Sequence, residues 1–403
     1  MKRLADLGIG PGRVVGIRAD FSADAVACLL ALVSAGAVAA LIPPGAPDTD
    51  TFLAAAKAHG LFSQEGDGSL TYGDRGPGGE HPLLKKLGAD GHGGVVIFSS
   101  GSTGRPKAVL HDFARFTRKF ETPGRALVTL GFLLFDHVAG LDTLCYTLAH
   151  GGTLVLPEGR DPQTVCRLIA AHRVQVLPVS PTFLNLLLLS GADREADLSA
   201  VEVITYGSEP MPDGLLKRLQ ERFSGTRLVQ KYGTTEFGAP PAKSRGDGPW
   251  LRFGPEVGTR VVDGILWVKA PGAMLGYLDR DTDMEDGWYC TGDQVEMDGD
   301  WMHVLGRKEE MINVGGEKVN PAEVEAVLLE LPGVAAARVT GEAHPITGQI
   351  VVATLQAAPG TGAEDLGLKV VRRHCRERLA PYKVPMKVAF GELISARHKT
   401  VRR

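Results

Sequence analysis

Short runs of aliphatic residues alternate with helical patterns from Arg13 onward, and this alternation constrains the fold more than any other feature of the sequence. The first cycle consists of the run Val14 to Arg18, a helical pattern from Ser22 to Ala35, and the run Val38 to Ile42. Strands that alternate with helices of this length are typical of parallel sheets with helices packed on their faces. The alternation therefore predicts an α/β fold with mostly parallel sheets.

The same alternation returns between Gly152 and Tyr206, with helical patterns from Pro162 to His172 and from Thr182 onward. The segment from Ala46 to Gly94 differs, because its glycine and charge content is higher and its hydrophobic periodicity fades. We expect that segment to be a connecting or surface region.

A chain of 403 residues is too long for one ordinary core, so two domains are expected. After Gly254 short strand-like runs predominate, until the polar turn Gly306-Arg-Lys-Glu-Glu precedes a second mixed pattern. In that second part Asn320 stands before a proline and an acidic residue, as at the start of a helix. We therefore predict a large N-terminal domain of residues 1–306 and a small C-terminal α+β domain of residues 307–403, joined by a hinge.

Composition argues against several classes of protein. The formal net charge of −3 gives no reason to expect a nucleic-acid partner. The cysteines are far apart and lack metal-binding spacing, which indicates reduced thiols: Cys28, Cys145, Cys166, Cys290 and Cys375. The apolar stretch from Ala25 to Pro43 is interrupted by glycine and is interpreted as a buried helix and strand, and we expect no signal peptide ahead of it. We expect a soluble, cytoplasmic protein that binds no membrane.

The segment from Val95 to Val109 combines a strand-like run with a loop rich in glycine and hydroxyl groups that ends in lysine. Glycines let backbone N–H groups converge on phosphate oxygens, hydroxyls add donors, and Lys107 supplies positive charge. The loop is not a Walker A sequence, because Pro106 precedes the lysine and the required spacing is absent. Without further context, a plain glycine-rich turn is the alternative interpretation.

The loop closely resembles the phosphate-binding signature of the adenylate-forming superfamily of acyl-CoA synthetases, adenylation domains and luciferases. Six further segments resemble motifs of this family and follow in the family's order: Phe135-Asp-His-Val-Ala-Gly, Tyr206-Gly-Ser-Glu-Pro-Met-Pro, Tyr232-Gly-Thr-Thr-Glu, Tyr289-Cys-Thr-Gly-Asp, Gly306-Arg-Lys-Glu-Glu and Leu379-Ala-Pro-Tyr-Lys-Val-Pro. The resemblance covers the chain from about Arg13 to Arg403. It implies ATP-dependent activation of an acid.

The resemblance also implies a set of nucleotide-binding residues: Ser99, Ser100, Gly101, Ser102, Thr103, Gly104, Lys107, Gly207, Ser208, Glu209, Pro210, Tyr232, Gly233, Thr234, Asp293 and Arg307. It implies that Thr235 contacts phosphate and that Glu236 binds Mg²⁺, for which one carboxylate suffices because nucleotide oxygens and waters complete the shell. From the residues alone, each of these two carboxylates has an alternative interpretation. Glu236 can be a solvated loop residue that binds no metal, and Asp293 can form an Asx-turn instead of binding ribose.

The family's catalytic lysine corresponds to Lys399, which would stabilise charge as pyrophosphate leaves. Here His398 replaces the glycine usual before that lysine, and a merely basic tail is the alternative. Glu309 matches the family's hinge position, with a solvated linker as its alternative, and Gly315 and Gly316 match the segment that lines a thiol tunnel.

The resemblance places Phe135, His137, Tyr206 and Phe237 at the acid pocket, although His137 has a packed core position as an equal alternative. A compact, partly aromatic pocket favours a small aromatic or short acyl acid. Family members have several dozen more residues ahead of the segment near Arg13, so we expect a shortened N-terminus.

The expected reaction is formation of an acyl-adenylate from an acid and ATP–Mg²⁺, followed by transfer of the acyl group to a thiol. Coenzyme A is the first choice, because Val314-Gly-Gly-Glu-Lys-Val resembles the form in CoA ligases, and C-terminal arginines such as Arg372 and Arg376 stand where they can meet its phosphates, unless they are only a solvated helix face. The alternatives are transfer to a carrier protein, transfer to an amine, activation of an anion other than a carboxylate, and a non-catalytic nucleotide-binding regulator.

Overall fold

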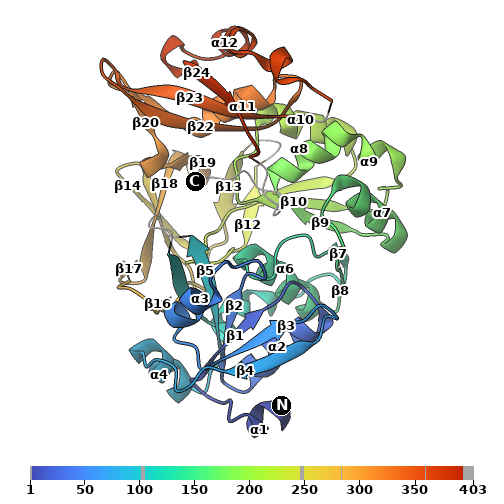
Figure 1. The fold of residues 1–403 in the computed structure, drawn as a ribbon, viewed down its shortest axis with the longest axis vertical. Coiled ribbons are helices and arrows are strands. Elements are labelled where there is room, and N and C mark those ends of the chain that lie inside the picture. The colour runs from blue at the N-terminus through green and yellow to red at the C-terminus, as the bar shows by residue number, and fades with distance from the viewer. Residues whose placement is uncertain (1, 101–104, 246–248, 283, 359, 394–403) are drawn as a thin grey trace.

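The computed structural model describes residues 2–100, 105–245, 249–282, 284–358 and 360–393. In these ranges, two sheets covered by helices precede an antiparallel sheet and a C-terminal α+β unit (Figure 1). The predicted α/β fold, with parallel sheets followed by a smaller α+β unit, is confirmed.

The first sheet has a parallel centre, in which β1 pairs with β2 and β3, and β2 pairs with β5. Antiparallel pairing adds the other strands at its edges. The strands, in spatial order, are β16 (Gly276–Tyr277), β6 (Pro106–Asp112), β5 (Gly94–Ser100), β2 (Val38–Ile42), β1 (Val14–Arg18), β3 (Gly60–Gln64) and β4 (Leu70–Asp74). The helices of this region are α1 (Lys2–Asp6), α2 (Ala23–Ser34), α3 (Thr49–Ala56), α4 (Pro82–Ala89) and α5 (Phe113–Thr117), with the 3-10 turn η1 (Arg118–Phe120).

The expectation for residues 46–94 is wrong. That segment contains helix α3, strands β3 and β4, and helix α4, and β3 pairs in parallel with β1. Its periodicity is weak because β4 lies at the sheet edge with mostly exposed side chains, so no buried face repeats along the sequence.

The second sheet is parallel throughout its described pairings, with the order β11 (Arg227–Lys231), β10 (Val203–Gly207), β9 (Val176–Val179), β7 (Val128–Leu130) and β8 (Thr153–Val155). Its helices are α6 (Val138–Ala149), α7 (Pro162–His172), α8 (Pro181–Ser190), α9 (Ala192–Glu195) and α10 (Asp213–Arg222). Helix α8 begins where the sequence predicts, because Ser180 caps it through the Phe183 N–H and a proline occupies its first turn.

The third sheet is antiparallel and holds β12 (Ala242–Ser244), β13 (Trp250–Phe253), β19 (Trp301–Arg307), β18 (Trp288–Asp298), β15 (Ile265–Lys269) and β14 (Gly258–Val262), with β17 (Met284–Glu285) paired to β18. Strands β13, β15 and β19 bury apolar side chains in a common core, around Leu251, Leu266 and Met302. In Figure 1 this sheet lies between the first sheet and the C-terminal unit, with the second sheet beside it.

The C-terminal unit follows the 3-10 turn η2 (Lys308–Glu310). Its strands are β20 (Ile312–Val314), β21 (Glu317–Val319), β22 (Val334–His344), β23 (Gly348–Ala357) and β24 (Lys387–Phe390), and its helical segments are α11 (Pro321–Leu329), η3 (Ala363–Leu366), α12 (Leu368–Arg376) and η4 (Pro381–Lys383). Asn320 caps α11, as predicted, by accepting from the Ala322 N–H. The division into domains after residue 306 falls at the end of β19 and stays a prediction.

Helices of the second sheet meet the C-terminal unit, since α8 contacts β22 and α10 contacts α11 (Figure 1). Within the described residues, no helix has the length and apolar character needed to cross a membrane.

Candidate active site

The hairpin of β5 and β6 brings Ser99 and Lys107 opposite each other at the end of the first sheet. The Ser99 hydroxyl is buried and has no hydrogen-bond partner within the described ranges. The carboxylate of Asp279 accepts from the Ala108 N–H at 2.8 Å and holds the start of β6. An unsatisfied hydroxyl opposite a lysine suits a phosphate oxygen. Of the other predicted loop residues, Gly101, Ser102, Thr103 and Gly104 lie outside the described residues.

The turn after β10 has a constrained backbone. A Cβ atom at Gly207 would lie 2.4 Å from the carbonyl oxygen of Lys231, so only glycine fits there. Ser208 follows with a φ of +69°, a left-handed conformation that costs energy for a non-glycine residue. Glu209, which precedes Pro210, accepts from the Thr182 N–H and hydroxyl at 3.2 and 2.7 Å, at the start of α8. The turn is therefore held rigidly beside Tyr206.

Three of the predicted nucleotide-binding residues, Tyr232, Asp293 and Arg307, come from distant segments, and Tyr232 and Arg307 both contact Asp293. The Tyr232 hydroxyl donates to one carboxylate oxygen of Asp293, and Arg307 Nε lies 2.8 Å from the other. Arg307 also donates to the Thr291 carbonyl at 3.0 Å. The local turn is formed by the Thr291 hydroxyl, which accepts from the Asp293 N–H at 3.0 Å. The side chain of Asp293 is thus directed to Tyr232 and Arg307 and forms no Asx-turn.

Burial governs protonation in this cluster. Burial raises the pKa of the Asp293 carboxyl, while the Arg307 guanidinium and the Tyr232 hydroxyl oppose that shift. Burial, together with the Asp293 charge, raises the pKa of Tyr232 well above its ordinary value. Tyr232 is therefore a neutral donor at physiological pH, and it orients the Asp293 carboxylate.

Glu236 is buried in the loop that follows β11. Its Oε1 accepts from the Tyr277 hydroxyl at 3.2 Å, its N–H donates to the Thr234 hydroxyl at 3.2 Å, and its carbonyl accepts from the Met274 N–H at 2.7 Å. Burial, and then the Glu236 charge, raise the pKa of Tyr277. In the described part of the chain, no basic side chain forms an ion pair with Glu236. The carboxylate is consequently available to a cation.

The loop around Glu236 is closed by a bridge between Thr234 and Gly238. A Cβ atom at Gly233 would lie 2.2 Å from the Gly238 carbonyl oxygen, which explains the glycine. Within the described residues, no group of three or more His, Cys, Asp or Glu side chains is arranged to hold a metal by protein ligands alone. A Mg²⁺ ion that takes one carboxylate and completes its shell with phosphate oxygens and water still fits the available Glu236.

The predicted acid-pocket rings belong to three different hydrophobic cores, and the pocket itself stays a prediction. Phe135 packs under the first sheet at 5.2 Å from Phe21, Tyr206 belongs to the core of the second sheet, and Phe237 lies among the aromatic rings of the third. His137 is the N-cap residue of α6, two residues after Phe135.

The predicted hinge and thiol-tunnel residues lie on the surface. Glu309 is exposed within η2, and Gly315 and Gly316 are exposed in the β20–β21 turn. Gly315 donates to the Thr347 carbonyl of its own unit at 2.8 Å. The predicted catalytic Lys399 lies outside the described residues.

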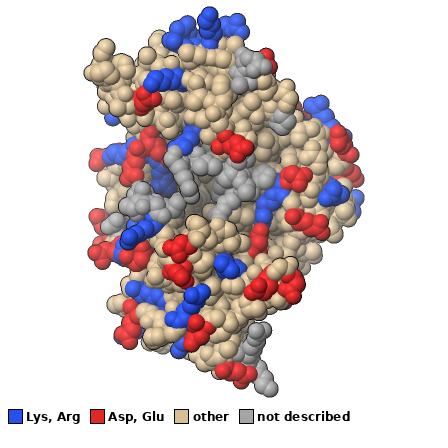
Figure 2. All heavy atoms as spheres, viewed as in Figure 1, with Lys and Arg blue, Asp and Glu red and all other residues tan. Residues whose placement is uncertain are grey.

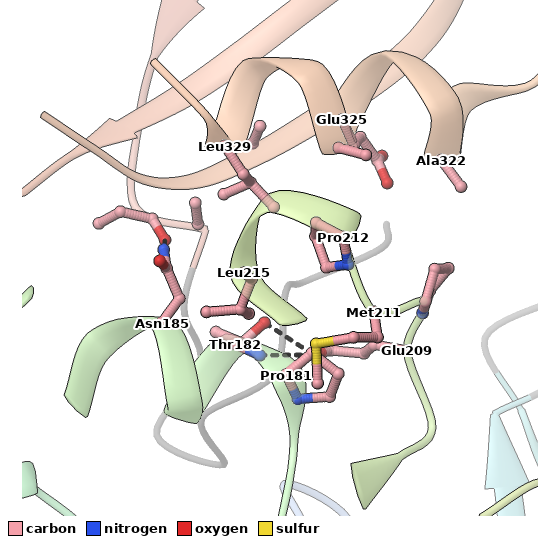
Figure 3. Close-up of a pocket in the computed structure, with 15 residues that line it drawn as sticks. Pro181, Thr182, Asn185, Glu209, Met211, Pro212, Leu215, Ala322, Glu325 and Leu329 are labelled. Carbon is pink, nitrogen blue, oxygen red and sulfur yellow. Dashed lines mark hydrogen bonds between the residues drawn. The ribbon is translucent and has the colours of Figure 1, made fainter. Parts of the chain in front are cut away.

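A small cleft of about 70 Å³ separates α8 and the β10–α10 turn from α11 and β22 (Figure 3). At its end Asn185 is 2% exposed, and its Nδ2 donates to the Ala335 carbonyl of β22 at 3.1 Å. Arg218 of α10 donates to Asn185 Oδ1 at 2.8 Å. Both ends of the Asn185 amide are therefore occupied, and one of these bonds crosses to the C-terminal unit.

Basic side chains gather at the top of the molecule in Figure 2, where Figure 1 places α12. Exposed members of that helix are Lys369, Arg373 and Arg376, while its Val371 and Cys375 are buried in the C-terminal core. The basic face therefore stands on the outer side of the C-terminal unit.

Several residues that touch the site were missed from the sequence. Tyr277 contacts Glu236 but carries no local motif, and His111 donates from Nε2 to the Thr235 carbonyl at 2.7 Å. Burial lowers the pKa of His111 to about 4, so the ring is neutral. Its position, four residues after Lys107 on β6, is the one signal that would have drawn attention to it.

Two family models match the chain. The model described as AMP-binding enzyme matches residues 91–278, and the model described as AMP-binding enzyme C-terminal domain matches residues 323–397. Together they contain the β5–β6 hairpin, the Glu236 loop and most of α11.

Curated proteins and solved structures are also similar to the chain. The feruloyl-CoA synthase of an Amycolatopsis species is 32% identical over 330 residues, which cover 74% of this chain and 66% of that protein. The 2-succinylbenzoate–CoA ligase of Bacillus licheniformis is 32% identical over 326 residues, covering 73% and 66%. The chain therefore spans just under two-thirds of the length of these relatives. The solved anthranilate CoA ligase AuaEII, in complex with anthranoyl-AMP, has a TM-score of 0.83 at 21% identity, covers 99% of this chain and 88% of its own, and shows the same fold.

Proposed function

The chain belongs to the AMP-binding enzyme family, and from this premise we propose that it activates a carboxylic acid with ATP and passes the acyl group to coenzyme A. The observation that carries the proposal is the convergence of Asp293, Arg307 and Tyr232, from three separate segments, near the available carboxylate of Glu236. Ordered groups of this kind suit the ribose, phosphate and metal of a nucleotide.

ATP would bind between the β5–β6 hairpin and the Glu236 loop. The Ser99 hydroxyl and Lys107 suit phosphate oxygens, the rigid turn from Gly207 to Pro210 suits the adenine side, and the Asp293 carboxylate accepts from ribose hydroxyls. Thr235 would contact phosphate from the same loop as Glu236.

Glu236 would hold Mg²⁺, with the Tyr277 hydroxyl fixing one carboxylate oxygen. When bound, the metal ion would neutralise the negative charge that builds up on the leaving pyrophosphate. The buried, neutral Tyr277 leaves the negative charge of Glu236 uncompensated, which favours the cation.

In the first half-reaction a carboxylate oxygen of the acid attacks the α-phosphorus of ATP, and the bond from that phosphorus to pyrophosphate breaks. The protein's task is to position the reactants and stabilise charge. Lys399 would provide that charge between the carboxylate and the α-phosphate. We place the acid beside α6, near His137, in keeping with relatives named for aromatic acids such as ferulate and 2-succinylbenzoate.

In the second half-reaction the thiolate of coenzyme A attacks the acyl carbon, and AMP leaves. The β20–β21 turn with Gly315 and Gly316 is exposed and bonded within its own unit, so a rotation about η2 at Glu309 would be needed to bring it to the acyl group. The basic face of α12 offers charge for the phosphates of coenzyme A.

Acid-dependent release of pyrophosphate tests the proposal. Ferulate, 4-coumarate, benzoate, anthranilate, indoleacetate, 2-succinylbenzoate and acetate are each offered with ATP–Mg²⁺, and products with coenzyme A are identified by mass spectrometry. We expect at least one acid to release pyrophosphate and yield its CoA thioester, and Lys399→Ala to abolish both. A folded protein that binds ATP but releases no pyrophosphate with any acid would be a nucleotide-binding regulator and not a ligase. An adenylate that reacts with a carrier protein or an amine but not with coenzyme A would rule out coenzyme A as the acceptor.

A further inference from the structure

Lys119 lies in η1, with its ammonium group enclosed by four partners. Its Nζ donates to the Ala239 carbonyl at 2.7 Å and forms an ion pair with Asp142. The same atom lies 5.0 Å from the ring centroids of both Phe116 and Phe120. The side chains of Lys119 and Asp142 are only 18% and 16% exposed. Because this ion pair is largely shielded from water, removing one of its two charges should cost more than it would in a surface ion pair.

The two polar partners of Lys119 belong to different parts of the candidate active site. Ala239 directly follows the loop that carries Thr235 and Glu236 and that the Thr234–Gly238 bridge closes. Asp142 lies in the second turn of α6, the helix that His137 caps. One ammonium group therefore joins the nucleotide loop to the helix beside which we place the acid.

The residues just before Lys119 hold the same loop from the same side. His111 donates to the Thr235 carbonyl, and Phe116 packs against His111 with ring centroids 5.6 Å apart. Arg115 donates from Nη2 to the Pro271 carbonyl at 3.1 Å, in the segment whose Met274 bonds Glu236. Of these four residues, His111, Arg115, Phe116 and Lys119, only Lys119 also forms an ion pair with α6 within the part of the chain that the structure describes.

We propose that Lys119, paired with Asp142, is a positioning residue that fixes the distance between the acid beside α6 and the nucleotide at the Thr235–Glu236 loop. The inference rests on the proposed function. Reaction of a carboxylate with the α-phosphorus requires the two atoms at near contact, and a displacement of about 1 Å can cost about 10²-fold in rate. Neither Lys119 nor Asp142 touches the reacting atoms in this arrangement.

Lys119→Met keeps most of the length and the apolar stem of the side chain and removes the ammonium group. It leaves the Asp142 carboxylate without its cation and the Ala239 carbonyl without its donor. The maximal rate of pyrophosphate release should fall about 10²-fold. The KM for the acid should rise about 10-fold, because the uncompensated carboxylate on α6 repels an anionic substrate, whereas the KM for ATP should stay within about 3-fold.

Two further variants separate charge from packing. Lys119→Arg keeps the cation and should retain most of the activity. The double variant Lys119→Met with Asp142→Asn removes the uncompensated carboxylate and should return the KM for the acid toward the wild-type value, while the rate stays low because the loop is still unsupported. Lys85→Met is the matched control, since Lys85 pairs with Glu80 on the surface with 66% and 83% exposure.

The kinetics use whichever acid of the panel the wild-type enzyme turns over fastest. Hydrogen exchange without substrate is measured in parallel on residues 233–239 and 138–143, where Lys119→Met should raise the exchange rates by about 10-fold in both segments and Lys85→Met should not. Unchanged exchange in either segment overturns the inference, as does an equal rise in the KM values for acid and ATP. If no acid releases pyrophosphate from the wild type, the proposed function fails, and the exchange result alone then decides whether Lys119 couples the two segments.

Discussion

Acidification should weaken the support under the Thr235–Glu236 loop through His111. The ring is fully buried, its Nε2–H donates to the Thr235 carbonyl, and burial lowers its pKa from 6.5 to about 4. The unfolded chain therefore binds the proton more tightly than the folded chain. The stability that neutral His111 confers is complete above about pH 6.5 and is lost as the pH falls through about 4.

The magnitude follows from the two pKa values. Each tenfold difference in proton affinity corresponds to about 1.36 kcal/mol, so the change from 6.5 to about 4 amounts to about 3 kcal/mol between these pH values. A loss of this size is a large share of the stability of an ordinary domain. It should be visible as a steep fall of the free energy of unfolding below pH 6.5.

The assay is urea unfolding followed by tryptophan fluorescence at a series of pH values from 7.5 to 4.5. All four tryptophans, Trp250, Trp267, Trp288 and Trp301, lie in the third sheet, which adjoins the Glu236 loop. His111→Gln keeps an amide donor for the Thr235 carbonyl and cannot titrate, so its stability should vary less with pH than that of the wild type.

His92→Gln is the control, because the Asp112 carboxylate raises the pKa of exposed His92 and gives the opposite sign of pH dependence. Parallel pH profiles for the wild type and His111→Gln would show that protonation of His111 does not cause the loss of stability.

The remaining predictions concern the site and the contact between the units. Glu236→Gln keeps an acceptor for Tyr277 but removes the charge, so pyrophosphate release should fall about 10²-fold and require more Mg²⁺; an unaltered Mg²⁺ titration would contradict the metal assignment. Asp293→Asn should raise the KM for ATP about 10-fold with little change in the KM for the acid, and equal changes in both would indicate general damage. Asn185→Leu removes the bond to Ala335, so adenylate formation should slow relative to thioester formation from a preformed acyl-adenylate, and an unchanged ratio would show that this contact does not hold the C-terminal unit.

Local patterns predicted much of the fold. The run Val14 to Arg18 and the helix Pro162 to His172 have the expected bounds, because a continuously buried apolar run specifies the strand and an Asp161 cap specifies the start of the helix. Strands β3 and β4 were missed because their stability comes from pairing with β1 and with each other, and β4 has little buried face to mark it.

The site was predictable only where a motif identifies it. The segments of Tyr232, Asp293 and Arg307 stand out in the sequence, and the structure brings their side chains together. Contacts such as that of Lys119 with Ala239 join residues 120 positions apart, and no periodicity or spacing in the sequence predicts them. The expected aromatic pocket stays a prediction, because Phe135, Tyr206 and Phe237 belong to three separate cores and no sequence pattern shows how those cores meet.

In the proposed function, the ordered nucleotide-binding groups serve to form an acyl-adenylate. The decisive experiment incubates the protein with ATP–Mg²⁺ and each acid of the panel, without coenzyme A, and measures pyrophosphate together with the mass of any adenylate retained by the protein. We predict that one or more aromatic or short acyl acids release pyrophosphate and yield an acyl-AMP of matching mass. Binding of ATP with neither product for any acid would contradict the account.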